Sequence, residues 1–257
     1  FVVRLLIPPA IILLLVPTLL CGCPEEGEEL RRYAIEVRNI SNHPMSPVVA
    51  AAHVPEVAMW EEGQHAGPGI GGLAMAGELS TLIDDLQARS GVTEVTYTVL
   101  PLPAMGLVVP RFGVHAGSGP DLTDTQTLEI DAVPGDVLSL AGGLLGTNDG
   151  FWGIDRAVLP ESGSAVYFAF GYDAGVEENN ELEAFINDDA SRLGPEPISG
   201  DEPDDEVDAD NRSQATAPPN GIRRHEGVLG VGDVPPSYNF NDVILRIEVT
   251  RGPLIQE

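Results

Sequence analysis

Alternation of apolar and polar residues is the main pattern along this chain. In residues 33–40, YAIEVRNI, apolar side chains occupy every second position, which is typical of a strand with one buried face. The same period of two recurs in residues 93–100, 125–133 and 243–250. Residues 164–170, SAVYFAF, are more continuously apolar, as in a strand buried on both faces. Gly- and Pro-rich turns separate these segments, so the sequence predicts an all-β fold, an antiparallel two-sheet β-sandwich.

Two segments depart from the strand pattern. Between about residues 70 and 90, apolar residues recur at three- and four-residue spacing, which predicts one helix that packs against a sheet and ends near Gly91. The apolar positions of this helix are Leu73, Ala76, Leu79, Leu82, Ile83 and Leu86. Residues 187–221 are rich in acids, proline and small polar residues, which bury too little apolar area to offset chain entropy. They predict an acidic, flexible insertion between two strands.

The first residues indicate export. Arg4 precedes an apolar run, the layout of a secretory signal peptide, so residues 1–22 are excluded from the fold. The sequence LCGC at the end of this run resembles a bacterial lipobox, which implies a lipid on Cys23 and an otherwise membrane-free protein. Plain secretion is the alternative. Residues 23–32 then form a charged tether, and residues 33–251 are long enough for one sandwich domain.

Charge narrows the classes of partner. The formal net charge is -27, and every basic residue is arginine. Nucleic-acid binding is disfavoured because phosphate recognition needs clustered cations. An acidic surface attracts cations, so either divalent ions or a saline habitat fits the composition. Both cysteines lie in the first 23 residues, so no internal disulfide is expected and a core, bound ions or both must stabilise the domain.

Enzyme signatures are not found in the sequence. There is no G-x-S-x-G elbow and no H-E-x-x-H motif, and the histidines are scattered. GPGIGG at 67–72 matches the dinucleotide fingerprint, but no buried strand precedes it, so it indicates a glycine-rich entry to the helix. The chain is therefore predicted not to be an enzyme, with a secreted hydrolase of unrecognised site as a remaining alternative.

Acidic turns are the strongest candidate chemistry. Asp149 and Asp155 flank the start of a predicted strand in NDGFWGID, and Asp173 follows the apolar SAVYFAF segment. Loops gathered at one end of a sandwich can bring such carboxylates together, and Ca²⁺ takes six to eight oxygen ligands. Asn, Asp and Gly also form ordinary turns without any ion. Spacing alone supports a calcium site and a plain turn equally.

Five collinear segments resemble the spondin N-terminal domain, a family of secreted calcium-binding sandwiches with single-domain versions in bacteria. These segments are YAIEVRNIS, AAAHVPEVAMWEEGQHAGPGIGGLAMAGE, TNDGFWGIDRAVLP, FGYDAGVEEN and GVLGVGDVPPSYNFNDVILRIEVTR. The pair NDGFWGID and YDAG carries most of the resemblance. The cysteines of vertebrate members are missing, the acidic insertion is not part of the family pattern, and no thrombospondin-type repeats follow, so the animal roles do not transfer.

The resemblance implies a set of calcium ligands and a function. The ligands would be Asp149, Asp155 and Asp173, with the backbone carbonyl of Ile154 and with Glu177 as a direct or second-sphere ligand. The expected function is a secreted or cell-surface, calcium-binding, non-enzymatic binding or adhesion module. Its partner would be an extracellular protein, a polysaccharide or another copy of the chain. The alternative is a subunit of an extracellular matrix or filament joined by calcium bridges.

Overall fold

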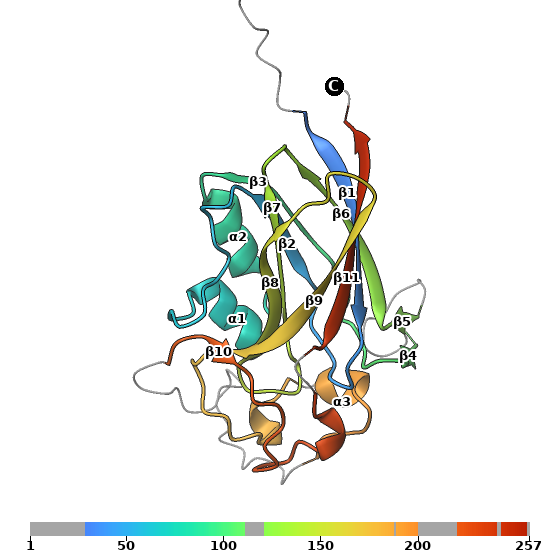
Figure 1. Ribbon diagram of the computed structural model, residues 1–257. Helices are drawn as coiled ribbons and strands as arrows, with labels where there is room; N and C mark the ends of the chain where they lie inside the picture. Colours follow the sequence, from blue (N-terminus) through green and yellow to red (C-terminus); the bar gives the residue numbers. More distant parts are fainter. Residues whose placement is uncertain (1–28, 111–120, 188, 200–219, 241–242, 256–257) are drawn as a thin grey trace, which may run out of the picture.

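The computed structural model describes residues 29–110, 121–187, 189–199, 220–240 and 243–255 (Figure 1). The predicted signal peptide, Cys23 and most of the acidic insertion lie outside these ranges. None of the described helices is long and apolar enough to cross a bilayer.

One antiparallel sheet of nine strands dominates the described residues, so the all-β prediction is confirmed. Eight strands follow the order β3-β2-β7-β8-β9-β11-β1-β6, and β10 pairs with β9. Its strands are β1 (Arg31–Asn39), β2 (Val49–His53), β3 (Val92–Tyr97), β6 (Thr125–Ala132), β7 (Val137–Gly143), β8 (Gly150–Val158), β9 (Ser164–Asp173), β10 (Arg223–Arg224) and β11 (Leu245–Leu254). A separate small ribbon joins β4 (Val108–Val109) to β5 (Leu122–Thr123).

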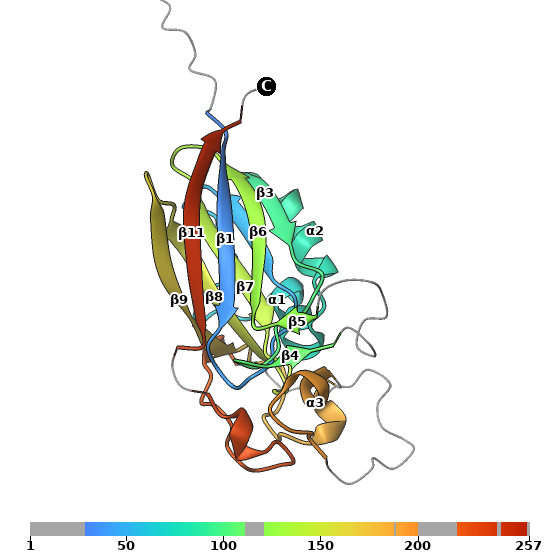
Figure 2. The same ribbon diagram turned by 90° about the vertical axis from the view of Figure 1, so that its right-hand side faces the viewer.

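The large sheet curls until its two end strands meet. Strands β3 and β6 contact each other, and the backbone N–H of Asp131 on β6 donates to the carboxylate of Glu94 on β3. The result is a nearly closed, barrel-like sheet (Figures 1 and 2). Its interior is a continuous apolar core that includes Ile35, Leu140 and Ile247, each fully buried. The predicted division into two separate sheets is not confirmed.

Helices cover only part of the outer surface. The predicted single helix is two helices, α1 (Pro68–Ala76) and α2 (Ser80–Ala88). They separate because Gly77 adopts a left-handed conformation with φ 66°, a common end for a helix. Leu73, Leu82 and Leu86 of the predicted stripe are buried against the sheet.

Strand β9 is more exposed than its sequence predicts. Val166 is 43% and Phe168 50% exposed on its outer face. The prediction of burial on both faces is wrong here because α1 and α2 cover the outer face over β2, β3, β7 and β8 and leave that of β9 uncovered (Figure 1). Beneath the helices, every residue of β2 and β7 is buried.

The loops after β9 form a cap at the end of the sheet opposite the start of β1 and the end of β11 (Figure 2). This cap holds the short helices η1 (Glu183–Phe185), α3 (Asp189–Leu193) and η2 (Pro236–Tyr238). Leu193, Ile198 and Tyr238 form its own small apolar core. The beginning of the predicted insertion is therefore packed rather than solvated, while residues 200–219 lie outside the described ranges.

Candidate functional site

Strands β8 and β9 bring two of the predicted aspartates together. Asp149 comes directly before β8, and Asp173 ends β9. Because the strands are antiparallel, Gly150 is paired with Asp173 in register. The backbone N–H of Ala174 donates to the carbonyl of Asp149 at 3.0 Å. Both aspartates thus lie where the sheet meets the cap.

The turn after β9 wraps around the carboxylate of Asp149. Its Oδ2 accepts hydrogen bonds from the backbone N–H groups of Val176 at 2.6 Å and Glu177 at 2.9 Å. The turn is shaped by Asp173, whose Oδ1 accepts from the N–H of Gly175 at 2.7 Å. Gly175 has φ 71°, which explains the glycine of the YDAG motif. Asn, Asp and Gly therefore do form turns here, and the turns place acids around Asp149.

Three acidic residues of these two turns are buried. Asp149 is 0%, Asp173 2% and Glu177 4% exposed. Burial, and then the charge of Asp173, raise the pKa of Asp149 to about 6, although backbone hydrogen bonds from Glu177 and Val176 oppose the shift. A raised pKa means that the ionised carboxylate is costly in this environment.

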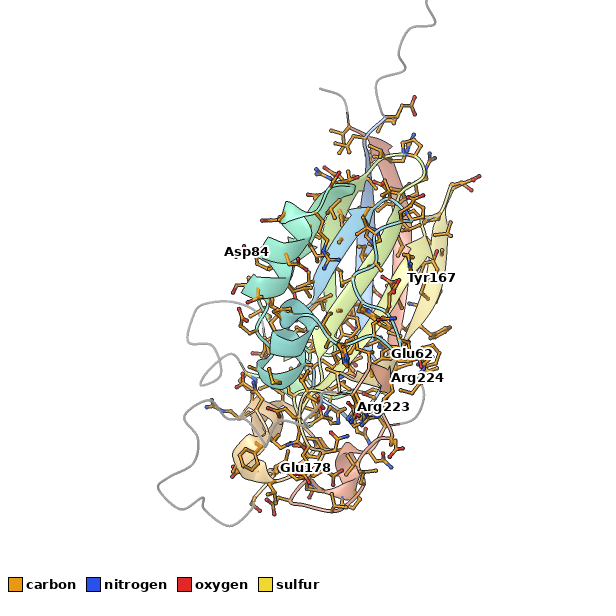
Figure 3. The ribbon with its side chains drawn as sticks, turned by 90° about the vertical axis from the view of Figure 1, so that its left-hand side faces the viewer. Glu62, Asp84, Tyr167, Glu178, Arg223 and Arg224 are labelled. Atoms are coloured by element: carbon orange, nitrogen blue, oxygen red, sulfur yellow. The ribbon has the colours of Figure 1, made fainter. Side chains whose placement is uncertain are left out.

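Asp173 and Asp149 differ in their hydrogen-bond partners. Asp173 Oδ2 accepts from Asn179 Nδ2 at 2.7 Å and from the guanidinium of Arg223 on β10 at 2.5 Å. Arg223 lies beside Arg224 at the lower end of the sheet, above the loop that carries Glu178 (Figure 3). Asp149 Oδ1, in contrast, is buried and has no hydrogen-bond partner in the described structure. A buried acceptor of this kind is usually satisfied by an ordered water or an ion.

Asp155 and Ile154 are not part of this group. Asp155 lies within β8, and the strand rise of about 3.3 Å per residue carries it more than about 10 Å from Asp149. Its carboxylate accepts from Met59 N–H at 3.1 Å and Ser139 Oγ at 2.9 Å, and it pairs with Arg156. Ile154 is paired with Leu140 in the β7–β8 ladder. The expected three-aspartate cage is therefore not assembled; Asp155 instead anchors the loop around Met59.

Sequence reasoning missed several residues that shape the site. Arg223 and Asn179 carry no motif that would have linked them to Asp173. Glu181 is buried with φ 55°, and its carboxylate accepts from the N–H groups of Gly230 at 2.8 Å and Val231 at 3.0 Å. It binds the turn after β9 to the glycine-rich loop at 227–232, so it is a structural acid in an acid-rich segment.

Within the described ranges, no three His, Cys, Asp or Glu side chains are already arranged to hold a metal ion. Two of the predicted ligands still meet one chemical requirement of a hard cation, because Asp149 has a buried oxygen without a hydrogen-bond partner and the charge of Asp173 acts on it. No family model and no curated protein matches this chain. The spondin resemblance therefore stays a prediction, and the site must be argued from its own geometry.

Proposed function

We propose that this protein is an extracellular, calcium-binding, non-enzymatic binding or adhesion module. The observation that carries the proposal is the buried Asp149 carboxylate, whose Oδ1 has no hydrogen-bond partner in the described residues. Asp173 acts on this carboxylate through its charge, and Glu177 donates its backbone N–H to it; both residues are buried. A calcium ion would supply positive charge at Asp149, whereas Asp173 is already paired with Arg223.

Calcium suits this site better than a softer metal. The three candidate ligands are all carboxylates, and hard oxygen donors select Ca²⁺ or Mg²⁺ over zinc or copper. Loop-borne ligands favour Ca²⁺ over Mg²⁺, since Ca²⁺ accepts irregular geometry. Backbone carbonyls or water would supply the remaining oxygen ligands. In this proposal the ion joins the start of β8 to the turn after β9, and so stabilises the boundary between sheet and cap. A two-layer sandwich arrangement of the curled sheet belongs to the same proposal.

Thermal unfolding with and without calcium tests the proposal. Calcium should raise the melting temperature, because a ligand that binds only the folded state stabilises it by about 2.7 kcal/mol at a hundredfold excess over Kd. Asp149→Asn and Asp173→Asn should each reduce this rise. Asp155→Asn is the matched control: it should lower the melting temperature but keep the response to calcium. Identical melts in calcium and in chelator would exclude the ion.

The cell-surface location is proposed from the lipobox-like LCGC sequence. Cys23→Ser should move the protein from the membrane fraction to the soluble fraction. An unchanged distribution would exclude the lipid anchor and leave ordinary secretion.

A further inference from the structure

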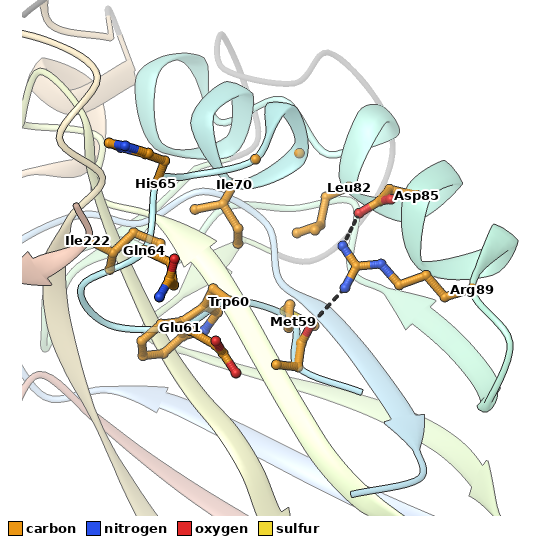
Figure 4. A pocket seen from close by; sticks show the side chains of 13 residues that line it. Met59, Trp60, Glu61, Gln64, His65, Ile70, Leu82, Asp85, Arg89 and Ile222 are labelled. Carbon is orange, nitrogen blue, oxygen red and sulfur yellow. Dashed lines mark hydrogen bonds and ion pairs between the residues drawn. The ribbon is translucent and has the colours of Figure 1, made fainter. Parts of the chain in front are cut away.

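A second feature lies on the helix-covered side of the sheet. The chain between β2 and α1 crosses over β8 and leaves a cavity of about 300 Å³ against α1 and α2 (Figure 4). Met59, Ile70 and Leu82 give it an apolar floor, and each of them is buried. Trp60 forms one wall. None of the acids proposed to bind calcium lines this cavity.

The indole of Trp60 is held rigidly. It packs against Tyr172 with ring centroids 4.3 Å apart, and edge-on against Phe151 at 5.3 Å. Its Nε1 lies over Gly153, where a Cβ atom would come within 3.0 Å of it. A side chain at position 153 would push the indole away from the sheet by a few tenths of an ångström.

The loop that carries Trp60 is anchored at both ends. On one side, Arg89 donates to the carbonyl of Ala58 at 2.6 Å, and the N–H of Met59 donates to Asp155. On the other, Gly63 N–H donates to the carbonyl of Ile222 at 2.7 Å. A preformed wall loses little conformational entropy when a ligand binds, which favours affinity.

Polar side chains with few internal partners surround the opening. Glu61 and Gln64 lie on either side of Trp60, and His65 lies farther along the same loop (Figure 4). The side chains of Gln64 and His65 make no hydrogen bond within the described residues, and the ion pair of Glu61 with Arg156 is long, at 3.8 Å. These groups offer both donors and acceptors to a ligand.

The charges around the cavity argue against an anionic ligand. Arg89 is the one cation among the lining residues, and its guanidinium is already bound to Ala58 and Asp85. The net charge of -27 also repels anions at long range. The ligand should therefore be uncharged, with an apolar face for Trp60 and several hydroxyl groups for the polar rim.

We propose that this cavity binds one hexose ring of a neutral polysaccharide. The C–H face of the sugar packs on Trp60, and its hydroxyl groups bond to Gln64 and Glu61. A volume of about 300 Å³ is at the lower end for small-molecule sites, which suits a single ring. This inference rests on the proposed function as a binding module and names its partner class.

Tryptophan fluorescence and affinity electrophoresis test the proposal. The chain has two tryptophans, and Trp152 is 0% exposed, so a change caused by sugar reports Trp60. With calcium at saturation, dextran, mannan and galactomannan are the neutral probes and dextran sulfate is the anionic one. At least one neutral probe should change the fluorescence saturably and retard the protein in the gel.

Substitutions locate the binding. Trp60→Ala should weaken retardation by about tenfold or more, from the loss of an aromatic contact. Gln64→Ala, at an exposed position, should weaken retardation several-fold without changing the melting temperature. This variant tests binding at the cavity if Trp60→Ala does not fold. Phe168→Ala removes an exposed aromatic ring outside the cavity and should leave retardation unchanged.

Three results would overturn this proposal: no response to any neutral probe, a response to dextran sulfate alone, or unchanged retardation of folded Trp60→Ala. The calcium melts are measured on the same samples. A calcium response without sugar binding would exclude the sugar site but keep the proposed calcium function. Sugar binding without a calcium response would exclude the calcium function but keep the sugar site.

Discussion

At the scale of single residues, the buried Asp149 carboxylate lowers the stability of the metal-free folded state. Its carboxylate accepts two backbone N–H groups through one oxygen, while the other oxygen is buried without a partner in the described structure. Arg223 contributes opposite charge, but it lies on Asp173. A residue that destabilises the metal-free state in this way is consistent with a site selected for binding rather than for stability.

The pKa of Asp149 predicts how stability depends on pH. The folded-state pKa is raised to about 6, above the ordinary 3.8, so the folded state holds its proton more tightly than the unfolded chain. Without calcium, this contribution is fully present below pH 3.8 and is lost as pH rises through about 6. The loss amounts to roughly 3 kcal/mol.

Asp149→Asn tests this prediction. The amide keeps an oxygen for the N–H groups of Val176 and Glu177 but carries no charge. In chelator at neutral pH, this variant should therefore melt at or above the melting temperature of the parent protein. Between pH 4 and pH 8, its free energy of unfolding should fall less than that of the parent. If the variant is less stable than the parent at pH 8 in chelator, the buried charge of Asp149 does not destabilise the folded state.

Arg223 provides a second prediction at this scale. Its guanidinium occupies Asp173 Oδ2, an oxygen that calcium would also use. Arg223→Gln should lower the melting temperature in chelator, because Asp149 and Asp173 then repel each other without a nearby cation. The same variant should bind calcium several-fold more tightly by calorimetry. Arg224→Gln is the control, since Arg224 stacks over Phe170 at 3.7 Å, and its loss should leave calcium affinity unchanged.

At the scale of elements, close approach of α1 to β7 depends on glycine. A Cβ atom at Gly143 would lie 2.6 Å from the backbone carbonyl of Leu73, which cannot move without the helix. Gly143→Ala should therefore displace α1 and destabilise the protein by about 1–3 kcal/mol, as overpacking does. Gly71→Ala is the contrast: it meets nothing within 4 Å and should stabilise α1 by about 0.5–1 kcal/mol. Chemical denaturation of both variants measures the difference, and equal effects would contradict the packing argument.

The elements that could be predicted from sequence are those with one buried face. Strands β1, β3, β6 and β11 were predicted because apolar residues alternate along them. Strands β2 and β7 are buried on both faces by core and helices, so their alanines and glycines show no alternation. The interruption of the helix at Gly77 was also missed, since the apolar stripe continues on both sides of it.

The candidate site shows a similar limit. Asp149 and Asp173 lie close together, as expected, because antiparallel pairing joins the start of β8 to the end of β9, while their binding of calcium stays a prediction. Asp155 was grouped with them on spacing and on the family resemblance, but an extended strand carries it away from both. Arg223 comes from a distant segment and reaches Asp173 only through the pairing of β10 with β9, which no local pattern indicates.

At the scale of the whole molecule, buried ligands and surface charge together predict the state of assembly. The acids proposed to bind calcium are 0%, 2% and 4% exposed, so an ion bound there would lie inside one copy and would not join two. Two copies that each carry a net charge of -27 repel each other over about 8 Å at physiological salt and about 3 Å at 1 M. We therefore expect a monomer in calcium, not a calcium-linked filament.

Light scattering of the mature protein tests this expectation. Calcium should raise the melting temperature without changing the measured mass, and deleting residues 201–210, where acids are densest, should change neither result. The alternative, a matrix subunit, requires growth of the mass in millimolar calcium that chelator reverses and that the deletion weakens. Magnesium at the same concentration is the control for screening, because it lowers repulsion equally but suits the loop-borne carboxylates less well. Assembly in calcium but not in magnesium would show that the ion joins surface acids of neighbouring copies, and the monomeric module would then be wrong.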